Sequence, residues 1–249
     1  RKRNKESIFT KKITPIKDEY TKFGMRIPEL KMFAMAMKDM NYLIDLTLQG
    51  NFMDEEMVRW LVSGLISNHT ILFLNLSNNQ INDSGVIKLS SYLLRTKTLI
   101  GIDLNNNKIT GDGGFALSIV IKENTFLKRL ILGMNKIDDA NCARILKALS
   151  LNEHLEELDL STNLEGELTA YALDVSLRSN STIKTIDFSY SNFFLIKDLI
   201  ETITNNPSLT KLDLRNSKVS TEDREKIQKI LVKKEVQLMR GITMNKIIK

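Results

Sequence analysis

The sequence predicts an α/β fold in which short strands alternate with helices in a tandem array. An asparagine recurs every 28 residues and closes a segment in which Leu or Ile stands eight, five and three positions earlier; these are Asn51, Asn79, Asn107, Asn135 and Asn163. The alternation of apolar and polar residues before each asparagine indicates a strand with one buried face. Small or apolar residues at every fourth position then indicate a helix stripe. Units of this size bury their apolar faces only by stacking, so function must be read from surfaces.

The number of units follows from the first apolar position of each strand. These positions are Leu43, Ile71, Leu99, Leu127, Leu155, Ile183 and Leu209. The first five steps are 28 residues, whereas the last is 26 and predicts a shortened turn or helix. We therefore expect about seven repeats over residues 43–217.

The junctions of each unit carry residues suited to turns. Asp54, Asp83 and Asp138 stand just before the helix stripes, where a carboxylate can accept hydrogen bonds from the first-turn amides, so they are predicted N-caps. Three residues ahead of most strands an asparagine is predicted to end the helix in the left-handed conformation; these are Asn68, Asn124, Asn152, Asn180 and Asn206.

The asparagine that closes each strand has a structural interpretation. Its amide can bond the main chain of adjacent turns and satisfy groups that would be costly to leave unpaired inside the stack. Ser191 and Ser217 replace it in the last two units, which predicts a looser end of this ladder.

These motifs resemble the leucine-rich-repeat family, and the 28-residue units with full helices are similar to its ribonuclease-inhibitor-like branch. The resemblance covers about Leu43 to Leu231. It implies a curved, horseshoe-shaped solenoid with a parallel sheet on the concave side and helices on the convex side. Function does not follow from the fold, because this branch serves many purposes.

The segments outside the repeats are predicted to cap the stack or extend from it. Residues 1–17 form a basic arm, and 18–42 form an N-terminal helical cap in which Phe33 and Met37 fill the stripe of a preceding unit. Residues 218–234 form a C-terminal capping helix. Residues 235–249 form a basic and apolar tail that packs on the solenoid or against a partner.

Charge is unevenly distributed along the chain. Residues 1–42 contain 11 basic and 5 acidic residues, 218–249 contain 9 and 4, and the segment between contains 16 and 21. The repeats are therefore acidic and both ends basic, within an overall net charge of +6.

The strand residues between the apolar positions are predicted to face the concave side. The central one in each unit is Thr47, Asn75, Asp103, Ile131, Asp159, Asp187 and Asp213. The candidate concave binding face consists of Asp103, Arg129, Glu157, Asp159, Asp187, Lys211, Asp213 and Arg215. One interpretation is a solvated sheet face whose charges maintain solubility, and the other is a docking surface for a basic segment of a partner.

Sequence motifs for catalysis, cofactors or metals are absent, so we expect no enzyme, no cofactor and no metal. His69 and His154 lie in equivalent turns of different units, and Cys142 is the single cysteine, which excludes an internal disulfide. A cytoplasmic, reducing compartment is expected, since cysteine-rich caps and a secretory signal are lacking. Apolar runs are too short for a membrane span.

Three function classes remain open. The first is a non-enzymatic scaffold that binds other proteins within a larger assembly. Its placement in a cilium, axoneme or cytoskeleton follows from a resemblance to leucine-rich-repeat subunits of the ciliary dynein regulatory complex, with the basic ends on an acidic partner such as a microtubule. The second is a regulator of a small GTPase, and the third an actin-filament end-binding protein resembling the tropomodulin family. Nucleic-acid binding is not expected, because the arms lack interleaved aromatics.

Overall fold

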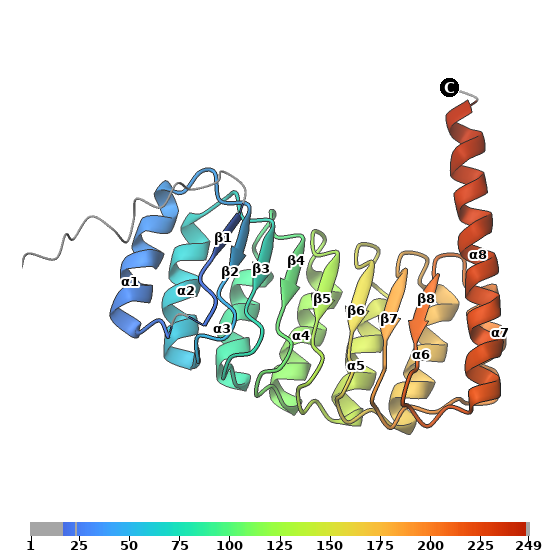
Figure 1. Cartoon of the computed structure of the whole chain (residues 1–249). Helices are drawn as coiled ribbons and strands as arrows, with labels where there is room; N and C mark the ends of the chain where they lie inside the picture. The colour runs from blue at the N-terminus through green and yellow to red at the C-terminus, as the bar shows by residue number, and fades with distance from the viewer. Residues whose placement is uncertain (1–16, 23, 248–249) are drawn as a thin grey trace, which may run out of the picture.

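The computed structural model describes residues 17–22 and 24–247. It contains one eight-stranded parallel sheet in which strands follow chain order (Figure 1). The strands are β1 Lys17–Glu19, β2 Asp45–Thr47, β3 Phe73–Asn75, β4 Gly101–Asp103, β5 Arg129–Ile131, β6 Glu157–Asp159, β7 Thr185–Asp187 and β8 Lys211–Asp213. Equivalent residues of neighbouring units pair directly, as Leu46 does with Leu74. The fold class predicted from the 28-residue period, an α/β solenoid, is confirmed.

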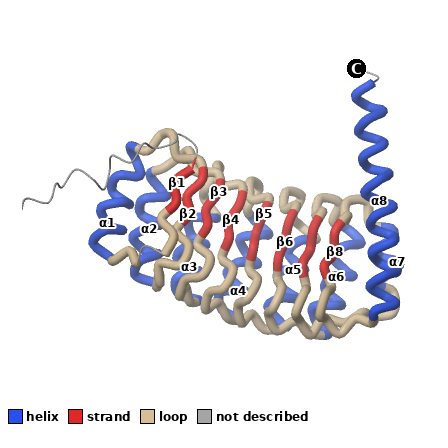
Figure 2. The backbone as a smooth tube through the Cα atoms, in the orientation of Figure 1, coloured by secondary structure: helices blue, strands red, loops and turns tan. Residues whose placement is uncertain are grey.

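All the helices of the repeats lie on the same side of the sheet (Figure 2). They are α1 Ile27–Ala36, α2 Glu55–Ser67, α3 Asp83–Leu93, α4 Gly111–Glu123, α5 Asp139–Leu149, α6 Glu167–Ser179 and α7 Leu199–Asn205, and a short 3₁₀ segment, η1 Met37–Asp39, follows α1. The opposite side of the sheet, which we call the sheet face, is left uncovered by them. The resemblance to leucine-rich-repeat proteins implied that this side is the concave one.

The core runs continuously through the stack between sheet and helices. The central strand residues Leu46, Leu130 and Leu158 are fully buried, and so are the residues two positions later, such as Leu132. Each unit therefore contributes the same inward-facing positions, and burying a Leu or Ile side chain stabilises the fold by about 1.5–3 kcal/mol. Adding units extends this core without changing its cross-section.

The asparagine that closes each strand joins neighbouring units. Asn79 donates from Nδ2 to the carbonyl oxygens of Leu48 and Leu76, at 3.1 and 2.9 Å, and its Oδ1 accepts from the amides of Asn51 and Met53. Asn107, Asn135 and Asn163 repeat the donor contacts in their own units. These side chains are buried and satisfy backbone groups that water cannot reach.

The asparagines at the helix ends form a second ladder, and the predicted left-handed conformation is wrong. Asn68, Asn124, Asn180 and Asn206 have extended backbone, with φ between −103° and −63°. Their side chains instead donate to carbonyls of the preceding unit, as Asn180 does to Leu149 at 2.8 Å. The left-handed residue lies just before the strand-closing asparagine or the serine that replaces it. Residues with this conformation are Gly50, Asn78, Asn106, Met134, Thr162, Tyr190 and Asn216.

The helix N-termini differ in part from the prediction. Asp54 and Asp138 cap their helices, accepting from the amides three residues on at 3.0 and 2.9 Å. Asp83 is not the cap of α3, because Asn82 occupies that position. Asp83 instead accepts from the Thr110 amide, which begins the next helix, at 2.6 Å. Carboxylates of one unit therefore cap the helix of the following unit.

The N-terminal end contains a strand that the sequence analysis did not predict. β1 crosses the boundary placed between the basic arm (1–17) and the helical cap (18–42), and it pairs in parallel with β2. The motif was hidden because Asp18 stands 28 residues before Leu46, where later units carry an apolar residue. The cap is thus a complete strand and helix unit, and Phe33 and Met37 are buried within it.

The C-terminal end departs from the prediction at residue 234. One helix, α8, spans Thr221–Ile247, so the predicted capping helix and the predicted tail (235–249) are continuous up to Ile247. Nothing between Leu231 and Arg240 breaks a helix, since that segment lacks glycine and proline. Ile227 and Leu231 of α8 are buried against the last unit. The C-terminal part of α8 extends past the strands (Figure 1).

Candidate interaction surface

Side chains on the sheet face lie in rows that cross the strands. The first row consists of Asp45, Phe73, Gly101, Arg129, Glu157, Thr185 and Lys211. The second row consists of Thr47, Asn75, Asp103, Ile131, Asp159, Asp187 and Asp213. Neighbours within a row are separated by one strand spacing, about 4.8 Å. We call Asp103, Asp159, Asp187 and Asp213 the acidic row.

The acidic row is held in place by the backbone that follows each strand. Asp103 accepts a hydrogen bond from the amide two residues on at 2.9 Å, and Asp159 and Asp187 do so at 2.8 and 2.7 Å. Asn75 makes the same bond at 2.9 Å. The carboxylates therefore terminate the strands as well as carrying charge, a role that the sequence analysis missed. The exchange of Asn and Asp within this row was a signal for it, because both supply the same acceptor oxygen.

Burial and mutual repulsion alter the acidity of this row. Burial raises the pKa of Asp159, neighbouring Asp187 and Asp103 raise it further, and hydrogen bonds from Ser161 offset only part of this. Burial likewise raises the pKa of Asp103. At Asp103 the amide of Asn105 and the charge of Arg129 offset part of this rise, whereas Asp159 lies in a region of negative potential that a cation would relieve.

The cations predicted to interrupt the acidic surface are mostly paired. Arg129 Nε lies 3.1 Å from a Glu157 oxygen on the next strand. Burial favours a raised pKa at Asp213, but hydrogen bonds from Arg215 outweigh it and hold the pKa below its usual value. Among the described residues no carboxylate lies within 4.0 Å of the Lys211 ammonium group. Within the described part of the chain, the candidate face thus contains two ion pairs, three carboxylates with no cation within 4.0 Å, and one cation, Lys211, with no carboxylate within that distance.

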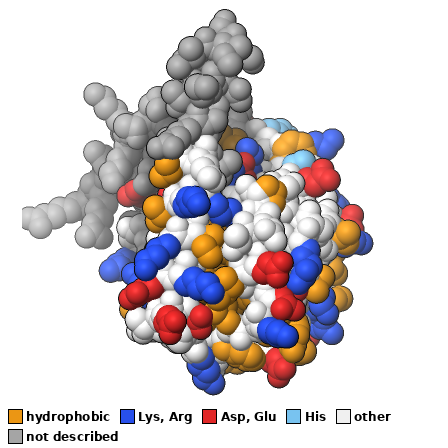
Figure 3. Space-filling view, turned by 90° about the vertical axis from the view of Figure 1, so that its right-hand side faces the viewer, with side chains coloured by type: hydrophobic (Ala, Val, Ile, Leu, Met, Phe, Trp, Pro, Cys, Tyr) orange, Lys and Arg blue, Asp and Glu red, His pale blue; other side chains and the backbone are white. Residues whose placement is uncertain are grey.

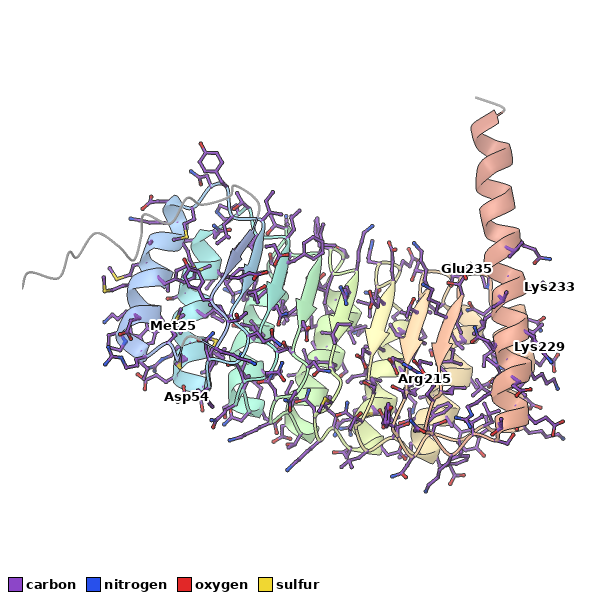
Figure 4. All side chains as sticks on the ribbon, in the orientation of Figure 1. Met25, Asp54, Arg215, Lys229, Lys233 and Glu235 are labelled. Carbon is purple, nitrogen blue, oxygen red and sulfur yellow. The ribbon has the colours of Figure 1, made fainter. Side chains whose placement is uncertain are left out.

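A groove lies where the sheet meets α8, and we call it the end groove. Its volume is about 590 Å³, and its lining includes Thr210, Lys211, Leu212, Leu214, Arg224, Ile227, Gln228, Val232 and Glu235. Four predicted residues also border it: Asp187, Lys211, Asp213 and Arg215. Figure 4 shows Glu235 on the side of α8 toward the strands, with Lys229 and Lys233 on the other side. The repeat register could not predict the α8 wall, because that register ends at β8.

The surface at this end of the stack is mixed in character. Figure 3 views it directly and shows Lys and Arg, Asp and Glu, and apolar side chains interspersed. A second, smaller hollow of about 180 Å³ lies over β2 to β5, between Phe73, Asp103 and Arg129. Gly101 permits it, since a Cβ there would lie 2.9 Å from the Phe73 ring. Phe73, which is 40% exposed, was not among the predicted site residues.

One ionisable side chain lies inside the stack. Glu165 is 1% exposed, and neither of its carboxyl oxygens has a hydrogen-bond partner. Burial raises its pKa to about 8, with further contributions from Asp159 and Asp139. The backbone amides of Asn163 and Glu165 lie near enough to lower this pKa in part, although neither has the geometry of a hydrogen bond to the carboxylate. Equivalent positions in other units hold Met53, Ile81, Ile109, Ile137 and Phe193. The same register could therefore have identified this acid from the sequence.

No cluster of three or more His, Cys, Asp or Glu in the described segments could hold a metal ion. Burial, with a contribution from Glu165, raises the pKa of Cys142 far above its usual range, so this thiol stays protonated. No helix within residues 17–247, as far as they are described, has the length and apolar character to cross a bilayer.

Comparison with known proteins agrees with this geometry. The model described as "Leucine Rich repeat" matches residues 67–90, 97–118, 123–140 and 205–227. The chain is thus an α/β solenoid, and its four matched segments are similar to leucine-rich repeats. No curated protein sequence matches it.

Three solved structures are similar to the chain at low identity. The leiomodin-1 actin-binding site 2 shares 15% identity over 89% of this chain and 96% of its own, with a TM-score of 0.41. An internalin from Listeria monocytogenes str. 4b F2365 shares 17% over 79% and 66%, with a TM-score of 0.46. The tropomodulin C-terminal domain of Caenorhabditis elegans shares 13% over 85% and 98%, with a TM-score of 0.41.

Proposed function

We propose that this protein is a non-enzymatic scaffold that binds other proteins through its sheet face within a larger assembly. The observation that carries the proposal is the acidic row, in which carboxylates stand at fixed positions on neighbouring strands and are held by the backbone. A charged group that is already ordered loses little conformational entropy when a partner binds. Such a surface suits recognition rather than chemistry.

The partner segment that this surface fits is basic. Asp159 and Asp187 occupy adjacent strands, and Asp103 lies two strands from Asp159 with Ile131 between them. Lysine or arginine side chains placed over these carboxylates would relieve the repulsion that raises the Asp159 pKa. Charge complementarity of this kind sets association rate and register more than total affinity.

Replacing Asp103, Asp159 and Asp187 together with Asn tests the proposal. Asn keeps the acceptor oxygen, as Asn75 shows within the same row, so the strand ends stay intact while three charges are removed. The control changes Glu55, Asp112 and Glu153, exposed residues outside the sheet face, to Gln, Asn and Gln.

Crosslinking mass spectrometry in extract of the source cells provides the measurement. We expect the sheet-face variant to lose crosslinked partners that the unchanged chain and the control variant retain. Partners retained equally by all three proteins would refute a role for the acidic row.

A cytoskeletal assembly is the placement that we favour, with microtubules as one partner. The basic ends, residues 1–42 and 218–249, carry net charges of +6 and +5, which suit an acidic polymer surface. The ciliary dynein regulatory complex, whose leucine-rich-repeat subunits the sequence resembles, is one such setting. Cosedimentation with microtubules over a salt series should show binding that weakens as salt rises, and binding independent of salt would exclude this mode.

An actin-filament end is a second candidate partner, favoured by the placement of α8. This helix of 27 residues follows the last strand directly, and tropomodulin-like proteins, which the sequence resembles, also join a short array to a C-terminal helix. Pointed-end elongation measured with labelled actin should slow in proportion to added protein. Elongation at an unchanged rate would remove this candidate.

A further inference from the structure

The outer edge of β8 carries backbone groups that are paired in every internal unit. One unit earlier, the Phe188 amide donates to the Asp213 carbonyl at 2.9 Å and the Tyr190 amide donates to the Arg215 carbonyl at 2.8 Å. The equivalent amides of the last unit belong to Leu214 and Asn216, and neither has a hydrogen-bond partner among the described residues.

The same edge also presents an acceptor. In the unit before, the Lys184 carbonyl accepts from the amides of Thr210 and Lys211, both at 2.9 Å. The equivalent carbonyl, that of Thr210, accepts no hydrogen bond from any described residue. The two amides and this carbonyl thus occupy the positions that, in the internal units, form hydrogen bonds to the next strand of the sheet.

These groups belong to residues beside the end groove, next to the part of α8 that packs on the last unit. Thr210 and Leu214 line the groove, and α8 forms its other wall through Arg224, Gln228 and Val232, which lie on one helical face. Helix α8 also contacts α7, where the Lys234 ammonium group donates to the Ile203 carbonyl at 2.8 Å. The space available to an additional chain segment is the end groove itself, about 590 Å³ between β8 and α8.

We propose that the end groove binds an extended segment of a partner protein, which pairs in parallel with β8 as a ninth strand. This inference rests on the proposed scaffold function and names a second contact for it. Backbone pairing supplies general affinity in such complexes, and side-chain positions supply specificity.

The charges along the edge of the sheet indicate which residues the bound partner segment should carry. On an internal pair of strands, Arg129 is neutralised by Glu157 of the following strand at 3.1 Å. Lys211 holds the same row on β8, and its neighbour on β7 is the uncharged Thr185. A glutamate or aspartate opposite Lys211 would complete the equivalent pair. The next position of the segment should be apolar, because Leu212, Ile227 and Val232 line the groove there.

The probe is a synthetic peptide with the sequence of residues 155–163 and Asn at the position of Asp159. Within the stack this segment already docks on such an edge, with Glu157 opposite Arg129. The substitution avoids repulsion from Asp213, which would lie beside it. A matched peptide carries Lys at the position of Glu157.

Two N-methylated peptides separate backbone pairing from side-chain docking. The amides of Glu156 and Glu157 face the preceding strand, where both donate to the Lys128 carbonyl, so methylating these positions should abolish binding to β8. The Leu160 amide donates to the following strand, so methylation there should be tolerated.

The measurements are fluorescence anisotropy of the labelled peptide and amide hydrogen exchange of the full chain. We expect saturable binding below about 1 mM and at least about tenfold slower exchange at Leu214 and Asn216. The Lys peptide should bind about tenfold more weakly. Gln228→Trp, which fills the groove, should block binding, whereas Lys229→Trp on the neighbouring position outside the groove should not.

Absence of binding at about 1 mM, or binding that survives methylation at the β8-facing amides or Gln228→Trp, would overturn the inference. The scaffold function is tested separately by the three Asp to Asn changes on the sheet face. If those changes remove partners while the peptide fails to bind, the function stands and only the ninth strand is wrong.

Discussion

Replacing the buried Glu165 with Met should stabilise the protein in a pH-dependent manner. The unfolded chain releases the carboxyl proton near pH 4.5, whereas burial holds the proton in the folded chain until about pH 8. Because the folded state binds the extra proton between these values, the free energy of unfolding falls as pH rises through this window. At 1.36 kcal/mol per pH unit, the loss at pH 7 is about 3 kcal/mol and saturates near 5 kcal/mol above pH 8.

Met removes this penalty without opening a cavity. Its side chain is as long as that of Glu, and Met53 fills the same register position with complete burial. It also eliminates two carboxyl oxygens that have no hydrogen-bond partner, which adds to the gain. We therefore expect Glu165→Met to raise the free energy of unfolding by at least about 3 kcal/mol at pH 7.

Urea unfolding followed by far-ultraviolet circular dichroism between pH 5 and 9 measures the effect. The wild-type and Glu165→Met curves should diverge steadily up to about pH 8. The control is Glu153→Gln, at an exposed position in the turn before β6. It should have the same dependence of unfolding free energy on pH as the wild type. Parallel profiles for wild type and Glu165→Met would refute the reasoning, since the buried acid would then ionise normally.

Three further changes probe the stack by urea unfolding. Asn135→Ala removes bonds that join neighbouring units and leaves buried backbone groups unpaired, so a loss of about 3 kcal/mol or more is expected; an unchanged midpoint would contradict the ladder. Leu130→Asp places an unpaired charge in the core and should cost more than about 3 kcal/mol; an unaltered curve would show the register to be wrong. Asp139→Ala removes the acceptor for the first amides of α6 and should cost about 1–2 kcal/mol at neutral pH. Burial alone would raise the Asp139 pKa, but hydrogen bonds from Thr169, Leu168 and Gly166 hold it below 3.8. The difference in unfolding free energy between wild type and Asp139→Ala should therefore shrink as pH falls below about 4. A difference that is independent of pH would argue against the cap.

The repeated part of the fold could be predicted because stacking imposes the same demand on every unit. A residue such as Leu130 must be apolar since identical positions lie above and below it, and each unit repeats the signal. β1 escaped prediction because it has one neighbouring strand instead of two, and its sequence departs from the pattern at Asp18. Terminal units face weaker packing constraints, so their sequences carry less of the period.

The sequence predicts where the candidate residues lie on the sheet, but only in part which of their charges are paired. The period of two within strands placed Asp159, Asp187 and Lys211 on the sheet face without knowledge of the structure. Pairing of Arg129 with Glu157 and of Arg215 with Asp213 depends on side-chain conformations that spacing does not specify. The end groove depends on how α8 crosses the last strand, and no repeat fixes that crossing.

The asparagine ladders satisfy the backbone inside the stack, whereas the carboxylates of the acidic row carry the surface charge and also bond the strand ends. The two asparagine ladders bond the main chain of most internal units, and Asn in place of Asp on the sheet face keeps the acceptor oxygen, so charge there can vary without weakening the stack. The exception is the unit that contains both Asp159 and Glu165, because the surface carboxylate raises the pKa of the buried one. Since Glu165 lies on the inner side of the sheet, replacing it should raise stability and leave partner binding at Asp159 intact. Stability and recognition are therefore separable even in the unit where their charges interact.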